Sequence, residues 1–205
     1  MLIQDDKKDK INQYIDLLKE YNETTNIYSK NSYDKLNYHI LDSENLGKFV
    51  SDSKVHVDLG SGSGLPAIII AIKTNCKVVC IESRLKKRDF LSYAKIALDL
   101  TNLHVFDGDV QLFTSRYSGA KINSISAKAF AKPPKLLWYL NLFRGHQISK
   151  DTVCWVPISK KQSEILSKYD EIISESLDGE IFYYFKVHLE KFQSYRAALK
   201  SEYTL

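Results

Sequence analysis

Cysteine is scarce in this chain of 205 residues, and its three cysteines form no metal-binding or redox pattern. They are Cys76, Cys80 and Cys154, an odd number with no pair at the short spacing of a zinc finger or a redox motif. Cys80 lies within the apolar run KVVCIE, which is typical of a buried free thiol. We therefore expect no metal site and no disulfide framework, which fits a reducing compartment.

Long apolar segments are also missing. The longest apolar run, residues 65–72, has eight residues and is too short to cross a membrane. Residues 1–10 (MLIQDDKKDK) are strongly charged and lack an apolar core, so we expect no signal peptide. Because 44% of the residues are hydrophobic and 12% aromatic, the chain is expected to be globular rather than disordered. Together these features predict a cytoplasmic protein, monomeric and without a membrane partner.

Acidic residues are absent from residues 110–150, although this segment carries seven basic residues. The net charge of the whole chain is only +4, so the rest of the chain is mildly acidic. The basic residues are Arg116, Lys121, Lys128, Lys132, Lys135, Arg144 and Lys150. Aromatic residues lie among them, a pattern that suits binding to a folded RNA. The helical spacing of Leu137 and Leu140 indicates instead that part of this aromatic content is core.

Strand and helix patterns alternate along the chain after a helical start. Helices are expected over 7–22, 33–50, 67–74, 86–100, 135–143 and 160–173, and strands over 55–60, 77–82, 103–109, 122–130, 152–158 and 181–189. This alternation is the signature of an α/β fold with stacked βαβ units and a parallel, Rossmann-like sheet. We expect residues 1–50 to form an N-terminal helical extension and residues 51–205 to form a single globular domain.

A glycine-rich turn follows the first expected strand, with the sequence Asp58-Leu59-Gly60-Ser61-Gly62-Ser63-Gly64. In open α/β sheets, ligands bind outside the carboxyl ends of the strands, where such a turn lies. A dinucleotide site requires a glycine at position 65, where this chain has Leu65. The shorter G-x-G-x-G spacing instead favours S-adenosylmethionine, which has no pyrophosphate, and the remaining alternative is a tight turn without a ligand.

Acidic side chains follow the next two strands. Glu82 ends the second strand, where a carboxylate can accept hydrogen bonds from both hydroxyls of a ribose. The third strand ends in Asp107-Gly108-Asp109, at the position where an adenine ring would lie. Taken with the glycine turn, these strand ends favour a nucleotide-containing small molecule over a solvated loop charge.

Four segments resemble the GidB/RsmG family of small-subunit ribosomal RNA (guanine-N7)-methyltransferases. They are HILDS (39–43), VDLGSGSGLPAIIIAI (57–72), IESRLKKRDFL (81–91) and SAKAFAKP (126–133). The resemblance extends from about residue 21 to residue 186. It implies a class I S-adenosylmethionine-dependent methyltransferase fold, S-adenosylmethionine as cofactor, and 16S rRNA or the small ribosomal subunit as partner.

The resemblance also implies which residues form the site. Cofactor contacts would be made by Asp58, Gly60, Ser61, Gly62, Leu65, Glu82, Ser83, Val110, Gln111 and Lys128. Lys128, which stands where the family motif S-R-A-F has arginine, would be a catalytic residue. His39 is the second catalytic candidate on its own chemistry, because an imidazole can stack on or hydrogen-bond a base; the alternative is a structural histidine. Guanine N7 carries a free lone pair at neutral pH, so its methylation requires alignment rather than a general base. Lys128 would then hold the donor or the substrate in register.

The chain differs from the family pattern at three points. Tyr38 stands in place of an arginine before His39, Ala67 in place of a glycine, and Val156-Pro157-Ile158 in place of a strand end in Lys-Gly. Two alternatives to the rRNA methyltransferase therefore stay open. One is a small-molecule methyltransferase, and the other is a relative that binds S-adenosylmethionine or RNA without catalysis or with altered specificity.

Overall fold

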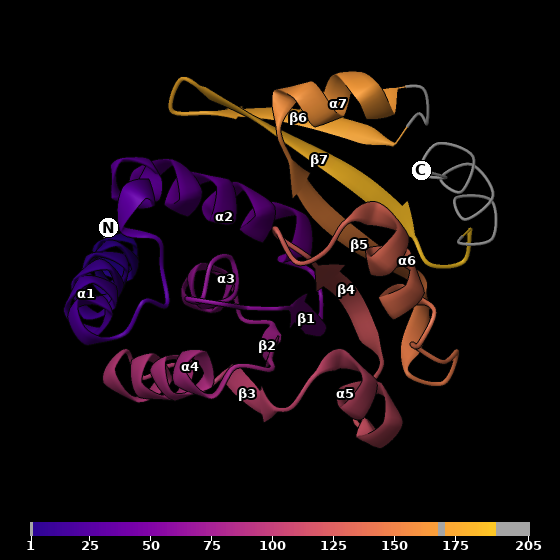
Figure 1. Cartoon of the computed structure of the whole chain (residues 1–205), viewed down its shortest axis with the longest axis horizontal. Coiled ribbons are helices and arrows are strands. Elements are labelled where there is room, and N and C mark those ends of the chain that lie inside the picture. Colours follow the sequence, from indigo (N-terminus) through magenta and orange to yellow (C-terminus); the bar gives the residue numbers. More distant parts are fainter. Residues whose placement is uncertain (1, 168–170, 192–205) are drawn as a thin grey trace.

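The computed structural model describes residues 2–167 and 171–191, which form one seven-stranded sheet with helices packed around it (Figure 1). The strands lie in the order β3-β2-β1-β4-β5-β7-β6. Their bounds are Val55–Leu59 (β1), Lys77–Glu82 (β2), Leu103–Asp107 (β3), Ile122–Ser126 (β4), Ile148–Ile158 (β5), Ile172–Leu177 (β6) and Glu180–His188 (β7). Strands β1 to β5 are parallel, and β7 pairs antiparallel with both β5 and β6.

Two α-helices and a 3-10 helix precede β1, and one helix follows each of the strands β1 to β5. They are α1 (Leu2–Thr24), the 3-10 helix η1 (Lys30–Lys35), α2 (Leu36–Val50), α3 (Ala67–Lys73), α4 (Leu85–Ala97), α5 (Val110–Arg116), α6 (Pro133–Leu140) and α7 (Lys160–Leu166). The predicted α/β class with a Rossmann-like sheet is confirmed; the sheet is parallel as predicted except for β7, which runs antiparallel. No helix within the described ranges has both the length and the apolar character that a membrane crossing requires.

The strand order places a ligand crevice beside β1. The chain runs from β1 outward through β2 to β3, then returns to the other side of β1 to form β4. The connections on the two sides of β1 therefore diverge at its carboxyl end, which is a topological switch point. The glycine-rich turn begins at this point, directly after Leu59.

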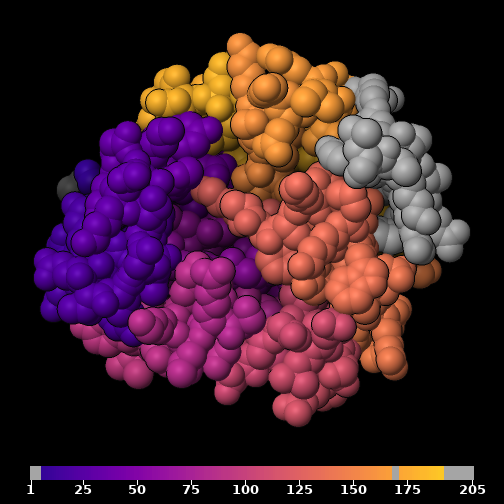
Figure 2. Space-filling view, in the orientation of Figure 1, coloured from indigo at the N-terminus to yellow at the C-terminus, as the bar shows by residue number. Residues whose placement is uncertain are grey.

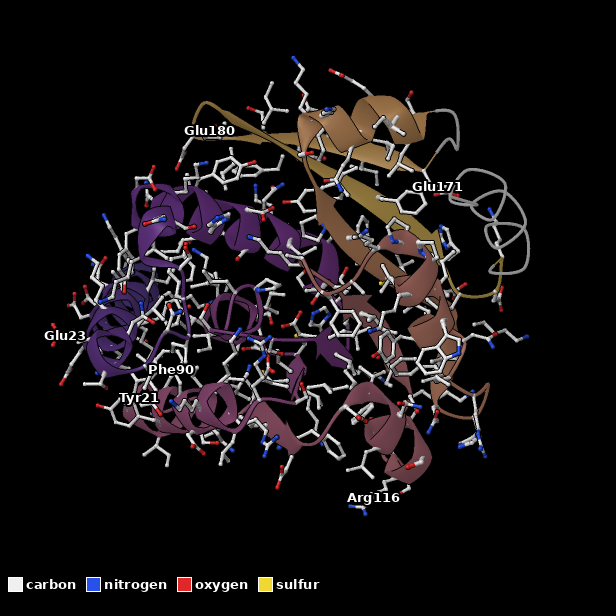
Figure 3. All side chains as sticks on the ribbon, in the orientation of Figure 1. Tyr21, Glu23, Phe90, Arg116, Glu171 and Glu180 are labelled. Atoms are coloured by element: carbon white, nitrogen blue, oxygen red, sulfur yellow. The ribbon has the colours of Figure 1, made fainter. Side chains whose placement is uncertain are left out.

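The two N-terminal helices pack against the sheet domain rather than standing apart from it. Tyr14 and Leu18 of α1 and Leu46 of α2 are fully buried in the same apolar cluster as Ile68 of α3. Figure 3 shows Tyr21 of α1 close to Phe90 of α4, and their ring centroids are 5.1 Å apart. The division of the chain at residue 50 stays a prediction.

Three elements differ from the pattern expected from sequence. The strand expected over 122–130 ends at Ser126, because pairing with β5 stops there and the chain turns at Ala129, whose φ is +49°. The helix expected over 160–173 is described only as far as α7, and Ile172 and Ile173 instead begin β6; residues 168–170 lie outside the described part. The short helix α5 was not expected; the side chain of Asp109 caps it by accepting a hydrogen bond from the backbone of Leu112.

Candidate active site

The glycine-rich turn adopts a backbone that only glycine accommodates easily. Gly60 has a φ of +69° and Gly62 a φ of +58°. A Cβ atom at Gly60 would lie 2.5 Å from the ring of Phe130, so a side chain there would meet both backbone strain and a steric clash. The turn therefore keeps its backbone close to the residues that follow β1, β2 and β4.

Glu82 fixes the turn to the end of β2. Its carboxylate is buried, and one oxygen accepts a hydrogen bond of 2.9 Å from the backbone N–H of Gly62. The other oxygen accepts a hydrogen bond of 2.9 Å from the backbone N–H of Arg84. Each carboxylate oxygen can accept a further hydrogen bond, so Glu82 can receive ligand hydroxyls at the place predicted for a ribose. Ser83, the next residue, is exposed.

Asp58 lies on the other side of the turn and is also buried. One of its oxygens accepts a hydrogen bond from the hydroxyl of Ser126, and its backbone carbonyl accepts one from Ser61. Its other carboxylate oxygen, Oδ2, has no hydrogen-bond partner among the described residues. Burial raises the pKa of Asp58 to about 6, although the hydrogen bonds and the ammonium of Lys128 act against this rise. A buried acceptor without a partner is suited to a cationic ligand group.

Tyr14 of α1 supports the turn from behind, a contact that the sequence did not indicate. Its side chain is fully buried, and its hydroxyl donates a hydrogen bond of 2.8 Å to the backbone carbonyl of Ser63. The only signal in the sequence was the position of Tyr14 on the apolar face of an amphipathic helix, which predicts burial but no partner. Leu65, predicted to contact the cofactor, packs its half-buried side chain against the apolar cluster under this helix.

The end of β3 is held by charge pairs. Arg88 of α4 lies 2.7 Å from the carboxylate of Asp107 and donates a hydrogen bond of 2.8 Å to the carbonyl of Ser83. This arginine thus joins the ends of β2 and β3. Val110 is buried at the start of α5, whereas Gln111 next to it is exposed. Of these two predicted cofactor contacts, which follow the strand end where an adenine would lie, Gln111 has the side chain that can reach a ligand.

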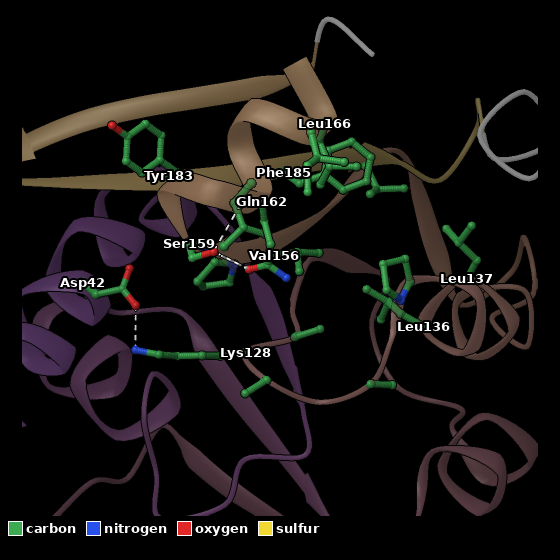
Figure 4. Close-up of a pocket in the computed structure, with 18 of the residues that line it drawn as sticks. Asp42, Lys128, Leu136, Leu137, Val156, Ser159, Gln162, Leu166, Tyr183 and Phe185 are labelled. Carbon is green, nitrogen blue, oxygen red and sulfur yellow. Dashed lines mark hydrogen bonds and ion pairs between the residues drawn. The ribbon is translucent and has the colours of Figure 1, made fainter. Parts of the chain in front are cut away.

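Lys128 and Asp42 form an ion pair between the end of β4 and helix α2. The Lys128 Nζ atom lies 2.6 Å from Asp42 Oδ2, as Figure 4 shows. The hydroxyl of Tyr184 on β7 donates a hydrogen bond of 2.9 Å to the other oxygen of Asp42. Only 16% of the Lys128 side chain and 7% of the Asp42 side chain are exposed, so the pair is largely shielded from water.

A cavity of about 370 Å³ opens beside this ion pair. Its walls come from α2, the residues after β4, the carboxyl end of β5, α7 and β7, and most of them are apolar (Figure 4). Asp42 and Lys128 are the charged residues in its lining, and the imidazole of His39 also faces it. The Nδ1 atom of His39 is buried without a hydrogen-bond partner in the described part of the chain. Burial, with help from Lys128, lowers the pKa of His39, so the ring is neutral at pH 7.

The predicted site residues thus fall into two groups on one face of the molecule. Asp58, Gly60, Ser61, Gly62 and Glu82 surround the glycine-rich turn, and Lys128 and His39 line the cavity. Lys128 links the groups, since it pairs with Asp42 and lowers the pKa of Asp58. Figure 2 shows this face hollowed between the N-terminal helices, the α4 segment and the α6 segment. No group of three or more metal-binding side chains occurs within residues 2–167 and 171–191.

Solved structures share this fold. A methyltransferase from Geobacter sulfurreducens superposes with a TM-score of 0.56 at 10% identity, covering 85% of this chain and 88% of that one. A SAM dependent methyltransferase from Aquifex aeolicus superposes with a TM-score of 0.51 at 12% identity, covering 78% of this chain and 97% of that one. At these identities the likeness establishes the fold alone.

Sequence relatives add the family. The protein named ribosomal RNA small subunit methyltransferase G from Nitrosococcus oceani is 34% identical over 121 residues, covering 58% of this chain and 55% of the relative's own length. The protein of the same name from Helicobacter pylori is 28% identical over 155 residues, covering 70% of this chain and 85% of the relative. The family model for GidB, rRNA small subunit methyltransferase G, matches residues 7–180. The resemblance inferred from the motifs is confirmed: the chain belongs to the GidB family of small-subunit rRNA methyltransferases.

Proposed function

We propose that this protein transfers the methyl group of S-adenosylmethionine to N7 of a guanine in 16S rRNA. The observation that carries the proposal is the pair of buried carboxylates on either side of the glycine-rich turn. Glu82 faces the turn with its orientation fixed by two backbone N–H groups, and Asp58 has one oxygen without a partner. These groups match the two polar ends of the donor, a ribose and an amino acid.

The residues at the turn fit the donor as follows. Glu82 would accept hydrogen bonds from the ribose hydroxyls, and the open oxygen of Asp58 would accept one from the α-ammonium group. The exposed side chain of Gln111, on the first turn of α5, would lie at the adenine edge. When bound, S-adenosylmethionine supplies an electrophilic methyl group on a sulfonium. Lys128 is kept from opposing this positive charge because its own charge is neutralised by Asp42 at 2.6 Å.

The cavity beside Lys128 would hold the acceptor base. Its apolar walls suit the faces of a purine, and Lys128, which also lies close enough to Asp58 to lower its pKa, lines it. His39 and Lys128 would position the guanine rather than remove a proton, because N7 already has a free lone pair. Methylation leaves a positive charge on the base, and Lys128 does not oppose this charge because Asp42 neutralises the lysine.

The partner and the place of action follow from this substrate. We propose that the chain acts as a monomer in the cytoplasm on 16S rRNA, either free or in the small ribosomal subunit. The basic residues that lie between positions 110 and 150 favour an RNA substrate over a small molecule.

The test is incubation with S-adenosylmethionine labelled in the methyl group and with small subunits or naked 16S rRNA that lack the modification. We expect label in one RNA form. A Glu82→Gln variant should need about 10- to 150-fold more donor for the same rate, since a charge-assisted hydrogen bond contributes about 1.5–3 kcal/mol. Donor binding without methyl transfer to either RNA would contradict the proposal and favour a non-catalytic relative.

A further inference from the structure

The aromatic residues of the basic segment 110–150 divide into a buried and an exposed set. Phe143 is 7% exposed and belongs to the apolar core, whereas Trp138 on α6 is 47% exposed. Leu136, Leu137 and Leu140 form the buried face of α6. Trp138 therefore belongs to the opposite face of the helix, and only the exposed part of the segment is available to a partner.

Two lysines share the exposed side of α6 with Trp138. Lys135 lies three residues before Trp138, so the two side chains stand one above the other on the helix. Lys132 precedes the helix as its N-terminal cap residue, and both lysines are exposed. The Lys135 ammonium also lies 5.9 Å from the ring centroid of Tyr139. Trp138, Lys132 and Lys135 are thus exposed together on one surface, which we call the outer face of α6.

This surface is connected to the glycine-rich turn by a series of ring contacts. The ring centroids of Trp138 and Tyr139 are 4.9 Å apart, and those of Tyr139 and Phe130 are also 4.9 Å apart. Phe130 in turn lies against Gly60. In Figure 2, the α6 segment forms one rim of the hollow on this face. A chain that enters the hollow would therefore pass the outer face of α6.

We propose that the outer face of α6 binds unpaired RNA next to the target guanine, with a base stacked on Trp138 and phosphates contacted by Lys132 and Lys135. Stacking on an exposed aromatic ring beside basic residues is how proteins hold single-stranded nucleic acid. The whole segment from 110 to 150 carries basic and no acidic residues, so its charge is complementary to the phosphates of RNA. The identity of the RNA rests on the proposed function, whereas the stacking surface does not.

Tryptophan fluorescence tests the stacking directly. The chain has two tryptophans, and Trp155 is 7% exposed and stacked on Phe49 at 4.6 Å. Trp155→Phe therefore leaves Trp138 as the only tryptophan, whose emission can be excited selectively at wavelengths that tyrosine does not absorb. We expect an unstructured RNA oligonucleotide to quench this fluorescence and a fully paired duplex of the same sequence to leave it nearly unchanged. Equal quenching by both RNAs, or by neither, would overturn the proposal.

Binding measurements on the otherwise unaltered chain provide the second arm. Because one stacked base contributes about 1–3 kcal/mol, Trp138→Ala should weaken binding to unpaired RNA by about 5- to 150-fold, and Trp138→Phe should restore most of it. Lys132→Ala and Lys135→Ala should each lower the slope of log affinity against log salt by about 0.7. The control is Ile96→Ala, which removes another exposed apolar side chain (78% exposed) from a different helix.

The two proposals fail separately. If no RNA is methylated but Trp138 is quenched by unpaired RNA, the proposed function fails and the stacking surface stands. If Trp138→Ala and the parent chain methylate 16S rRNA with the same KM for the RNA, the proposal of a stacking surface is wrong and the proposed function stands. Unchanged affinity for S-adenosylmethionine in Trp138→Ala confirms in either case that the variant is folded.

Discussion

His56 is joined to Asp58 by a single hydroxyl group, that of Ser126. The Nε2 atom of His56 lies 2.9 Å from Ser126 Oγ, and this hydroxyl donates its hydrogen to Asp58. On the other side of the ring, Nδ1 lies 2.8 Å from Ser124 Oγ, which is 2.8 Å from Ser53 Oγ. Because the carboxylate can only accept, Nε2 must donate to Ser126 and Nδ1 must accept from Ser124. The whole series of donors therefore points toward Asp58.

The buried imidazole predicts a specific loss of stability in acid. Burial lowers the pKa of His56 from 6.5 to about 3, so below pH 6.5 the unfolded chain takes up a proton that the folded chain does not. The contribution of His56 to the free energy of unfolding should thus fall between about pH 6.5 and pH 3. His56→Gln, which keeps a donor and an acceptor but does not titrate, should lack this contribution. Urea denaturation at several pH values measures it, and parallel curves for the two proteins would contradict the assignment.

The carboxylate of Asp58 predicts that donor binding depends on pH. Its effect on stability has the opposite sign to that of His56. Its pKa is raised to about 6, so between about pH 6 and pH 4 the folded chain binds a proton that the unfolded chain does not. The contribution of Asp58 to the free energy of unfolding therefore rises as the pH falls through this range. The ionised form is the one that accepts from an ammonium group. Affinity for S-adenosylmethionine should therefore decrease as the pH falls through 6, and Asp58→Asn should bind weakly with little pH dependence. Calorimetry at pH 5 to 8 measures both, and an equal pH dependence in the variant would remove Asp58 from the donor site.

The glycine-rich turn offers a matched pair of alanine substitutions. Gly60→Ala places a Cβ against Phe130 at a φ of +69°, whereas Gly145→Ala places one where no atom lies within 4 Å. We expect Gly60→Ala to cost about 1–2 kcal/mol of stability and to abolish tight donor binding. Gly145→Ala should change stability by less than about 0.5 kcal/mol. Thermal denaturation with and without donor compares them; similar behaviour of the two variants would show that the conformation at Gly60 is not required.

The ion pair of Lys128 and Asp42 predicts non-additive effects. Lys128→Ala should lower turnover and should cost a few kcal/mol of stability, because it leaves a largely buried carboxylate without its partner. The double variant with Asp42→Ala should lose less stability than the sum of the losses in the two single variants. Lys128→Arg keeps the charge and should retain most of the turnover. Stability and methyl transfer are measured for the parent chain, the two single alanine variants, the double variant and Lys128→Arg. Unchanged donor affinity and turnover in Lys128→Ala would contradict the role given to this lysine.

The features that the sequence predicted well are those that depend on neighbouring residues. The turn at 60–64 and the acid at Glu82 could be placed because a strand end, a glycine spacing and the next strand end are all local patterns. The alternation of strands and helices likewise predicted the α/β class, although not the order of the strands in the sheet. These elements required no knowledge of which distant residues meet.

The features that the sequence could not predict depend on contacts across the chain. Asp42 meets Tyr184, 142 residues later, because β7 inserts antiparallel beside β5 and brings this tyrosine under α2. Tyr14 reaches Ser63 only because α1 packs against α3. Strand β6 has a weak apolar alternation and is formed by its pairing with β7. Local propensity contains none of this information.

Mapping the methylated atom tests the central claim most directly. N7-methylguanine becomes sensitive to reduction and strand cleavage by aniline, so the reacted 16S rRNA can be cleaved and the break located by primer extension. We expect one new cleavage at a single guanine, which requires both enzyme and S-adenosylmethionine and disappears with Glu82→Gln at limiting donor. Label at a base atom other than guanine N7, or in no RNA at all, would contradict it.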